Sequence, residues 1–358
     1  MLYNQKLFNN IAVFNAVYET ASGNLPQQEF TYVEVEPGQG FYAWNDYNGN
    51  GIQEIDEFEI AQFPDEARYL RVALPTLNYL QTHQTKLSTS VNLNFQQWST
   101  KTKFKKLLSH FQNQTYLLID NKQEREAGSF NMNPFDINAE NLLALNYNLK
   151  NSLFFNRGKQ NYSTTYNYIK SQNKTNYAVD ELEGNIQLHQ LQFVHKFKDF
   201  WLIDFKTDIA SNQNNSLNYA SRNYDIETYG FHPKLSYIYN NSNSLDFFYA
   251  FKNKENTIGE FETLAMHNLG ASYRFSNQKK TSINAEFNYF SNDFMGNSNS
   301  PVAYQMLEGL QNGNNFTWSL LWLQKLTNFL DLNINYLGRK SETSKTIHSG
   351  TVQLRAHF

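Results

Sequence analysis

The strongest constraint on the fold is a two-residue alternation of apolar and polar side chains. The runs 201–209, 269–275, 282–290 and 330–338 place apolar residues at nearly every second position, with charged or amide residues between them. This period is typical of a β-strand with apolar surroundings on one face and polar surroundings on the other. Several runs reach about ten residues, the length that a tilted strand needs to cross a bilayer. The sequence therefore predicts an all-β protein.

Aromatic residues are frequent for so polar a chain. Phe, Trp and Tyr make up 16% of the 358 residues, although the mean hydropathy is −0.63. A soluble core does not require this mixture, whereas a sheet with one lipid-facing side and one wet side does. Aromatic residues near the expected strand ends fit the girdles of a membrane barrel. They are Trp98, Trp201, Tyr239, Tyr249, Trp318, Trp322 and Tyr336.

Charge and cysteine content exclude several classes of protein. The net charge of −3 argues against a broad surface for nucleic acid, which requires an excess of positive charge. The chain has no cysteine, so disulfides, thiolate catalysis and cysteine-bound metals are excluded. No run of about 18 apolar residues predicts a transmembrane helix.

The connections between the expected strands alternate between short and long. The segments 240–244, 276–281 and 326–329 are short, whereas 252–266 and 291–315 are long. Tight periplasmic turns on one side and longer outward loops on the other are typical of outer-membrane barrels. The pattern favours a transmembrane β-barrel over a soluble β-sandwich.

The last predicted strand ends on an aromatic residue. Val352, Leu354, Ala356 and Phe358 alternate with polar residues. This ending resembles the signal that the barrel-assembly machinery of Gram-negative outer membranes recognises. The Asn- and Tyr-rich strands and the cassette 42–63 resemble carboxy-terminal barrel regions of poorly characterised surface or outer-membrane proteins of Bacteroidota. The resemblance implies an outer-membrane location, contact with outer-membrane lipid and lipopolysaccharide, and the assembly machinery as a partner.

Strand direction follows if the carboxy terminus is periplasmic. Residues 85–358 then form antiparallel barrel strands, and residues 1–18 supply a first strand within 6–18. The total is about 14, an even number as in bacterial single-chain barrels, alone or as part of a larger barrel. Residues 19–84 would lie between an outward and an inward strand, so this segment is expected outside the cell.

The stretch WNDYNGNGIQEIDEFE, residues 44–59, has the layout of a calcium loop. An EF-type loop supplies oxygen atoms from positions 1, 3, 5, 7, 9 and 12, with glycine at position 6. The corresponding residues are Asp46, Asn48, Asn50, the main chain of Ile52, Glu54 and Glu57, with Gly51 at position 6. This spacing predicts a bound Ca²⁺.

The loop also departs from an EF-hand. Gln53 occupies the usually apolar eighth position, and the residues before Asp46 suggest a strand rather than a helix. Two neutral Asn ligands predict weak binding, with a Kd of about 10⁻⁴–10⁻³ M. Two alternatives stay open: Asp56 could replace Glu57 as the last ligand, or the stretch could be an Asn/Gly turn with an acidic flank.

No catalytic motif is evident. There is no G-x-S-x-G, no phosphate-binding loop and no histidine cluster with ligand spacing, so no enzymatic activity is predicted. The charges expected to face the lumen are of mixed sign: Asp204, Lys206, Asp208, Arg274, Glu286, Asp331 and Arg355, together with the polar Gln353. They suit a wet or plugged lumen.

Three functions fit these features. The first is an outer-membrane barrel for transport, secretion-associated passage or surface display, with a structural Ca²⁺ in an external segment. The second is a soluble or surface-attached all-β module that binds its ligand with calcium. The third is the barrel of a nutrient-import receptor without its plug in this chain.

Overall fold

A computed structural model describes residues 1–27, 29–75, 78–99, 102–125, 132–137, 140–159, 161–176, 181–240, 242–277 and 280–357. The chain forms one 15-stranded sheet and one four-stranded sheet. In the large sheet every neighbouring pair is antiparallel, and the strands follow chain order except for the four strands inserted between β2 and β7. The predicted all-β, antiparallel fold is confirmed.

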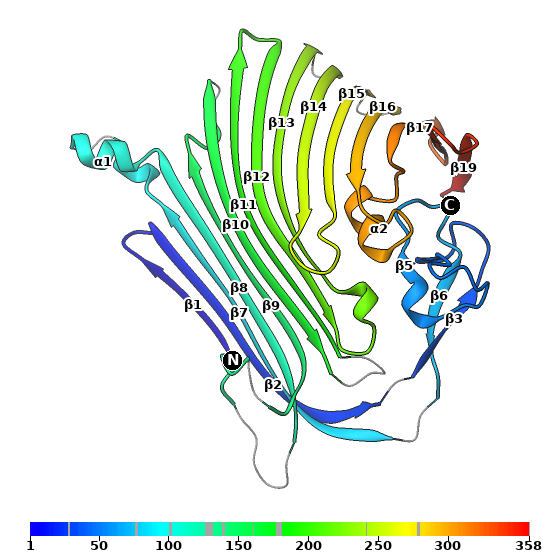
Figure 1. Ribbon diagram of the computed structural model, residues 1–358. Helices are drawn as coiled ribbons and strands as arrows, with labels where there is room; N and C mark the ends of the chain where they lie inside the picture. The colour runs from blue at the N-terminus through cyan, green and yellow to red at the C-terminus, as the bar shows by residue number, and fades with distance from the viewer. Residues whose placement is uncertain are drawn as a thin grey trace.

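The strands of the large sheet are long. They are β1 Leu2–Leu7, β2 Ala12–Pro26, β7 Tyr79–Asn94, β8 Phe111–Glu124, β9 Leu142–Phe155, β10 Tyr162–Thr175, β11 Leu182–Phe197, β12 Trp201–Ser216, β13 Tyr224–Asn240, β14 Asn243–Asn256, β15 Thr263–Asn277, β16 Thr281–Met295, β17 Gly313–Thr327, β18 Leu330–Ser341 and β19 Ile347–Ala356. Figure 1 shows that they form a strongly curved sheet. Within the described residues, β1 and β19 each pair on one side only.

The remaining elements lie in the connections. The small sheet has the order β3-β6-β4-β5, made of β3 Phe30–Glu34, β4 Tyr42–Trp44, β5 Phe58–Ile60 and β6 Tyr69–Ala73. The helices are η1 Ile55–Glu57, η2 Gln96–Trp98, α1 Lys103–Leu108, η3 Ala220–Arg222 and α2 Pro301–Leu307. In the part of the chain that the structure describes, no helix is long and apolar enough to cross a membrane.

The first 18 residues differ from the prediction of a single strand. Phe8, Asn9 and Asn10 all have positive φ angles, of 54°, 55° and 68°, and reverse the chain between β1 and β2. Asn tolerates this conformation better than most residues. The reversal adds a strand, so the large sheet has 15 strands rather than about 14.

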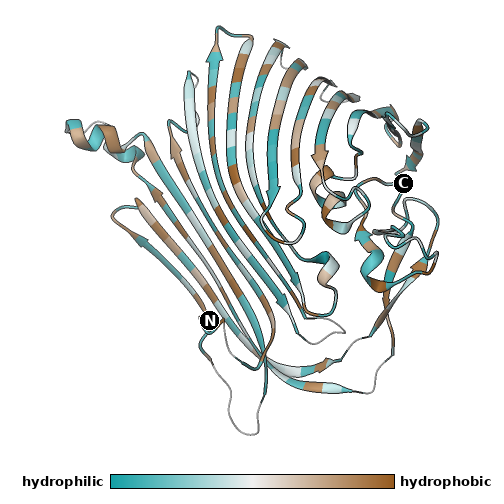
Figure 2. Cartoon of the chain, in the orientation of Figure 1, coloured by the Kyte–Doolittle hydropathy of each residue, from teal (hydrophilic) through white to brown (hydrophobic). Residues whose placement is uncertain are grey.

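The two faces of the large sheet differ in chemistry, as the alternation predicts. Figure 2 shows the alternation itself, as hydrophilic and hydrophobic bands that follow one another along the strands. The face that we call polar carries Asp204 and Asp208. Asp208 Oδ1 lies 2.8 Å from His232 Nε2, and Asp204 Oδ1 accepts a hydrogen bond from Gln192 Nε2 at 2.9 Å. The other face, which we call apolar, carries aromatic side chains that are close to half exposed: Phe205 44%, Phe231 45%, Phe247 49% and Phe287 48%.

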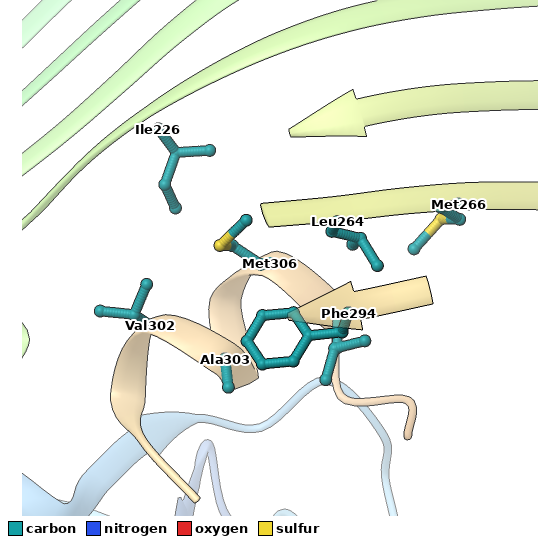
Figure 3. Close-up of a cluster of buried hydrophobic side chains, with 8 residues drawn as sticks. Ile226, Leu264, Met266, Phe294, Val302, Ala303 and Met306 are labelled. Carbon is teal, nitrogen blue, oxygen red and sulfur yellow. The ribbon is translucent and has the colours of Figure 1, made fainter. Parts of the chain in front are cut away.

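Helix α2 covers an apolar patch at one end of the polar face. Its Ala303 and Met306 are fully buried against Leu264 and Met266 of β15 (Figure 3). The helix begins where the Ser300 hydroxyl accepts a hydrogen bond from the Ala303 N–H at 3.1 Å. This N-cap satisfies an amide that the helix itself leaves free. Of the two buried apolar clusters in the described structure, the larger one is at α2, which lies next to β5 in Figure 1.

Candidate functional site

The residues between β2 and β7, 27–78, form a separate unit that we call the inserted segment. The predicted outward segment was longer, 19–84. Its ends belong to the large sheet instead, because Glu19 pairs with Lys86 and Pro26 with Tyr79 in continuous strands. The inserted segment contains the small sheet and lies beside α2 and the later strands in Figure 1.

The first anchor of this segment is Arg339 on the polar face of β18. One guanidinium nitrogen lies 2.7 Å from Asp65 Oδ2 and 2.6 Å from Glu66 Oε1. The guanidinium carbon also lies 4.1 Å from the centre of the Phe63 ring. Only 14% of the Arg339 side chain is exposed, so solvent screens these contacts weakly.

The second anchor is Tyr304 of α2. Its hydroxyl accepts the N–H of Gln62 at 3.0 Å and lies 3.3 Å from Glu66 Oε2. Burial raises the pKa of this phenol above its usual range, so it stays neutral and can donate to the carboxylate. Just after α2, Gly309 has a φ of +74°, and a Cβ there would come within 2.8 Å of Gln62. Close packing and backbone conformation both require glycine at this position.

The third anchor joins the calcium-like loop to two connections of the large sheet. Asn299 Nδ2 donates to the carbonyls of Tyr47 at 3.0 Å and Asp46 at 3.4 Å. The Ser221 hydroxyl donates to Asp56 Oδ2 at 3.3 Å. The loop is thus part of the contact that holds the inserted segment on the sheet.

A neighbouring ion pair belongs to the same contact. Arg222 Nη2 lies 3.4 Å from Glu59 Oε2, and the Glu59 side chain is almost fully buried. Burial raises the pKa of the Glu59 carboxyl, and the Arg222 guanidinium opposes this rise. Stability contributed by this group decreases as pH rises through the raised pKa, because the buried carboxyl must then give up its proton.

The first half of the calcium-like loop is organised by side-chain to backbone hydrogen bonds. Asp46 accepts the N–H groups of Gly49 at 2.7 Å, Asn50 at 3.1 Å and Gly51 at 2.8 Å. Gly51 has a φ of +72°, as expected for the glycine at position 6. Local spacing alone therefore places Asp46, Asn50 and Gly51 in one tight turn.

The other predicted ligands lie around this turn. Asn50 Oδ1 accepts the N–H of Ile52 at 2.6 Å. Asn48 Nδ2 donates to Glu54 Oε2 at 2.5 Å, so positions 3 and 9 are already in contact. Among the described residues, no three His, Asp and Glu side chains are grouped so that they could hold a metal ion. A cation here would thus depend on amide and main-chain oxygen atoms as well as carboxylates.

Glu57 is the residue of the loop whose environment best fits a cation. It is 2% exposed. Its Oε2 accepts the indole N–H of Trp44 at 2.8 Å and the N–H of Glu54 at 3.4 Å. Its Oε1 is buried and has no hydrogen-bond partner in the described structure. A buried carboxylate oxygen without a partner is costly, and a divalent cation is one group that satisfies it.

The predicted assembly signal lies on the edge strand β19. Val352 and Leu354 are 70% and 60% exposed and lie opposite Ile334 and Leu332 of β18. Ala356 is the last residue of the strand. Phe358 lies outside the described residues.

These features define a large curved antiparallel sheet with a docked segment that contains the calcium-like loop. No family model and no curated protein matches the sequence. Among solved structures, the chain is similar to the crystal structure of the outer membrane channel DcaP of Acinetobacter baumannii, with 9% identity, a TM-score of 0.41 and 96% of each chain covered. At that level of similarity, the function has to be argued from the geometry of this chain.

The end of α2 gives a pH prediction. Burial alone would raise the pKa of the Glu308 carboxyl, but Lys254 and Lys252, at 2.8 and 2.7 Å, outweigh burial and lower it to about 2. The stability from this group is present above pH 4.5 and is lost as pH falls towards 2. Because 41% of the carboxylate side chain is exposed, we expect a contribution of only about 1 kcal/mol.

Hydrogen exchange of the α2 amides measures this contribution. At pH 7, Glu308→Gln should exchange about fivefold faster than wild type, and the ratio should approach one as pH falls below the pKa. Glu260→Gln is the matched control, because Glu260 is exposed and has no ion pair in the described structure. A ratio that does not change with pH would contradict the assignment.

Proposed function

We propose that the chain is an outer-membrane β-barrel protein of a Gram-negative bacterium, with a passage or surface-display role and no enzymatic activity. The observation that carries the proposal is the length and two-sidedness of the strands. β12 and β13 have 16 and 17 residues, a length of about 50 Å at 3.3 Å per residue, which spans a bilayer core even at a tilt of about 45°. Lipid would cover the half-exposed aromatic side chains of the apolar face.

The polar face supports a wet lumen. It carries paired charges such as Asp204 with Lys234 and Asp208 with His232, together with many amide side chains. Charges of both signs argue against a selectivity ring of a single charge. The inserted segment, docked through Arg339 on the same face, would narrow the passage at one end.

We further propose that the loop from Asp46 to Glu57 holds a structural Ca²⁺. Asp46, Asn48, Asn50, Glu54 and Glu57 would supply side-chain oxygen atoms, and Ile52 its carbonyl. The buried, partnerless Glu57 Oε1 supports this assignment. Because Asn299 and Ser221 hold the same loop, the ion would stiffen the contact between the inserted segment and the large sheet. We also propose that β19, with Val352 and Leu354, is the strand that the barrel-assembly machinery recognises.

Extraction and gel mobility test the membrane proposal. We expect the protein to stay in envelope membranes in alkaline carbonate and to dissolve in detergent. Without boiling, it should migrate faster than after heat denaturation, because a folded membrane β-barrel resists unfolding by detergent. Release by carbonate without detergent would refute the barrel and favour the calcium-dependent soluble module.

A further inference from the structure

A hollow of ≈ 380 Å³ lies at the short-turn end of the polar face, and no described residue of the inserted segment lines it. It is formed where β15 to β19 meet their tight turns. The lining side chains that could contact a ligand include Lys280, Lys325, Asp331, Asn333, Gln353 and Arg355. Three of these are cations and one is a carboxylate.

The charged residues form a row across adjacent strands. Lys325 lies opposite Asp331, and Asp331 lies opposite Arg355 in the sheet register. The N–H of Lys325 donates to the carbonyl of Lys280 at 2.7 Å, so Lys280 extends the row by one strand. Strands in a sheet lie about 4.8 Å apart, so the row spans roughly 14 Å of backbone from Lys280 to Arg355. Only because lysine and arginine side chains are long can the three cationic groups converge on one small ligand.

The cations of this row lack carboxylate partners. In the described structure, none of Lys280, Lys325 and Arg355 has a carboxylate within 4.0 Å, and Asp331 pairs instead with His357 Nε2 at 2.9 Å. By contrast, Arg339 and Lys254 on the same face each have a carboxylate within 3 Å. Among the described lining residues, three cations therefore face one carboxylate, which leaves a net positive charge in the hollow.

The next row of the polar face supplies neutral polar groups. Asn333 lies opposite Gln353, and Ser282 opposite Leu323. Asn333 Oδ1 is buried and has no donor in the described structure. The exposed amide of Gln353 offers both an acceptor and a donor to a hydroxyl group of a ligand in the hollow. The pattern thus combines cations for an oxyanion with an acceptor for a hydroxyl.

We propose that this hollow binds a small hydroxylated oxyanion, a carboxylate or phosphate that also carries hydroxyl groups. Lys280, Lys325 and Arg355 hold the anionic group, and Asn333 and Gln353 hold the hydroxyl groups. The proposal goes beyond the passage role given above. The binding site depends on the geometry of one face of the sheet and not on membrane insertion. The binding proposal and the membrane proposal can therefore fail independently of each other.

Calorimetric titration of the full chain in non-ionic detergent tests the site, with gluconate as the probe and glucose as its uncharged counterpart. We expect gluconate to bind, glucose to give no measurable heat, and binding to weaken about tenfold when NaCl rises from about 0.05 to about 0.5 M. Lys325→Gln with Arg355→Gln should weaken gluconate binding at least about tenfold, since two of three cations are lost.

Three further variants make the result specific. Lys280→Gln removes an exposed cation and should weaken binding about threefold to fivefold. Asp331→Asn should strengthen binding by a similar factor. Lys150→Gln is the matched control, an exposed cation on the polar face of β9, and should change nothing. Equal binding by the double variant, equal binding of glucose, or no gluconate heat at all would each overturn the proposal. Heat from phosphatidylglycerol micelles together with no heat from gluconate would instead assign the site to a lipid headgroup and also overturn the proposal.

Discussion

Replacement of Arg339 by leucine is expected to release the inserted segment from the large sheet. The change leaves Asp65 and Glu66 next to each other without the guanidinium that lies 2.7 and 2.6 Å away. Removing one partner of a largely buried ion pair costs about 3–5 kcal/mol. Both carboxylates are partly exposed, at 23% and 26%, so we expect the substitution to destabilise the docked state by about 2–3 kcal/mol.

Hydrogen exchange distinguishes release of the segment from general unfolding. Amides of the small sheet should exchange roughly 30- to 100-fold faster in Arg339→Leu, while those of β12 and β13 keep their wild-type rates. Lys340→Leu removes the neighbouring cation, which is exposed and lies on the other face of β18. If the two variants give the same small-sheet rates, Arg339 does not anchor the segment.

Replacement of Glu57 by glutamine is expected to remove calcium binding at millimolar concentration. Glutamine keeps an acceptor for the indole N–H of Trp44 but removes the negative charge of the proposed last ligand. Loss of that charge should raise the Kd from about 10⁻⁴–10⁻³ M by roughly 10- to 100-fold. Titration with terbium measures this directly, because Trp44 contacts Glu57 at 2.8 Å and can transfer excitation to an ion bound there.

Asp56→Asn is the control for the calcium prediction, since it removes the adjacent carboxylate. Asp56 accepts a hydrogen bond from Ser221, so this variant tests the rival last ligand without touching Trp44. We expect its terbium affinity to stay within about threefold of wild type. Loss of binding in Asp56→Asn with retention in Glu57→Gln would reverse the ligand assignment. No terbium or calcium response in the wild type would leave the stretch as an Asn/Gly turn.

The sequence predicted those features that depend on neighbouring residues. Alternation identified the strands of the large sheet, because a pleated strand turns successive side chains to opposite faces. The tight turn from Asp46 to Gly51 is also predictable from the sequence, because its hydrogen bonds join residues no more than five positions apart. The reversal at Phe8–Asn10 was missed, because the apolar pattern continues across it and only the backbone conformation marks the turn.

Only the tertiary structure decided what the inserted segment touches. Arg339 lies 274 positions from Asp65 in the chain, and Tyr304 lies 242 positions from Gln62, and neither residue belongs to a local motif. The same holds for the row of Lys280, Lys325 and Arg355, which forms only once the register of four strands is set. Strand identity follows from local side-chain period, whereas these contacts depend on how the sheet curves and aligns its strands. That alignment is set by pairing energies summed over the whole sheet, which no short stretch of sequence contains.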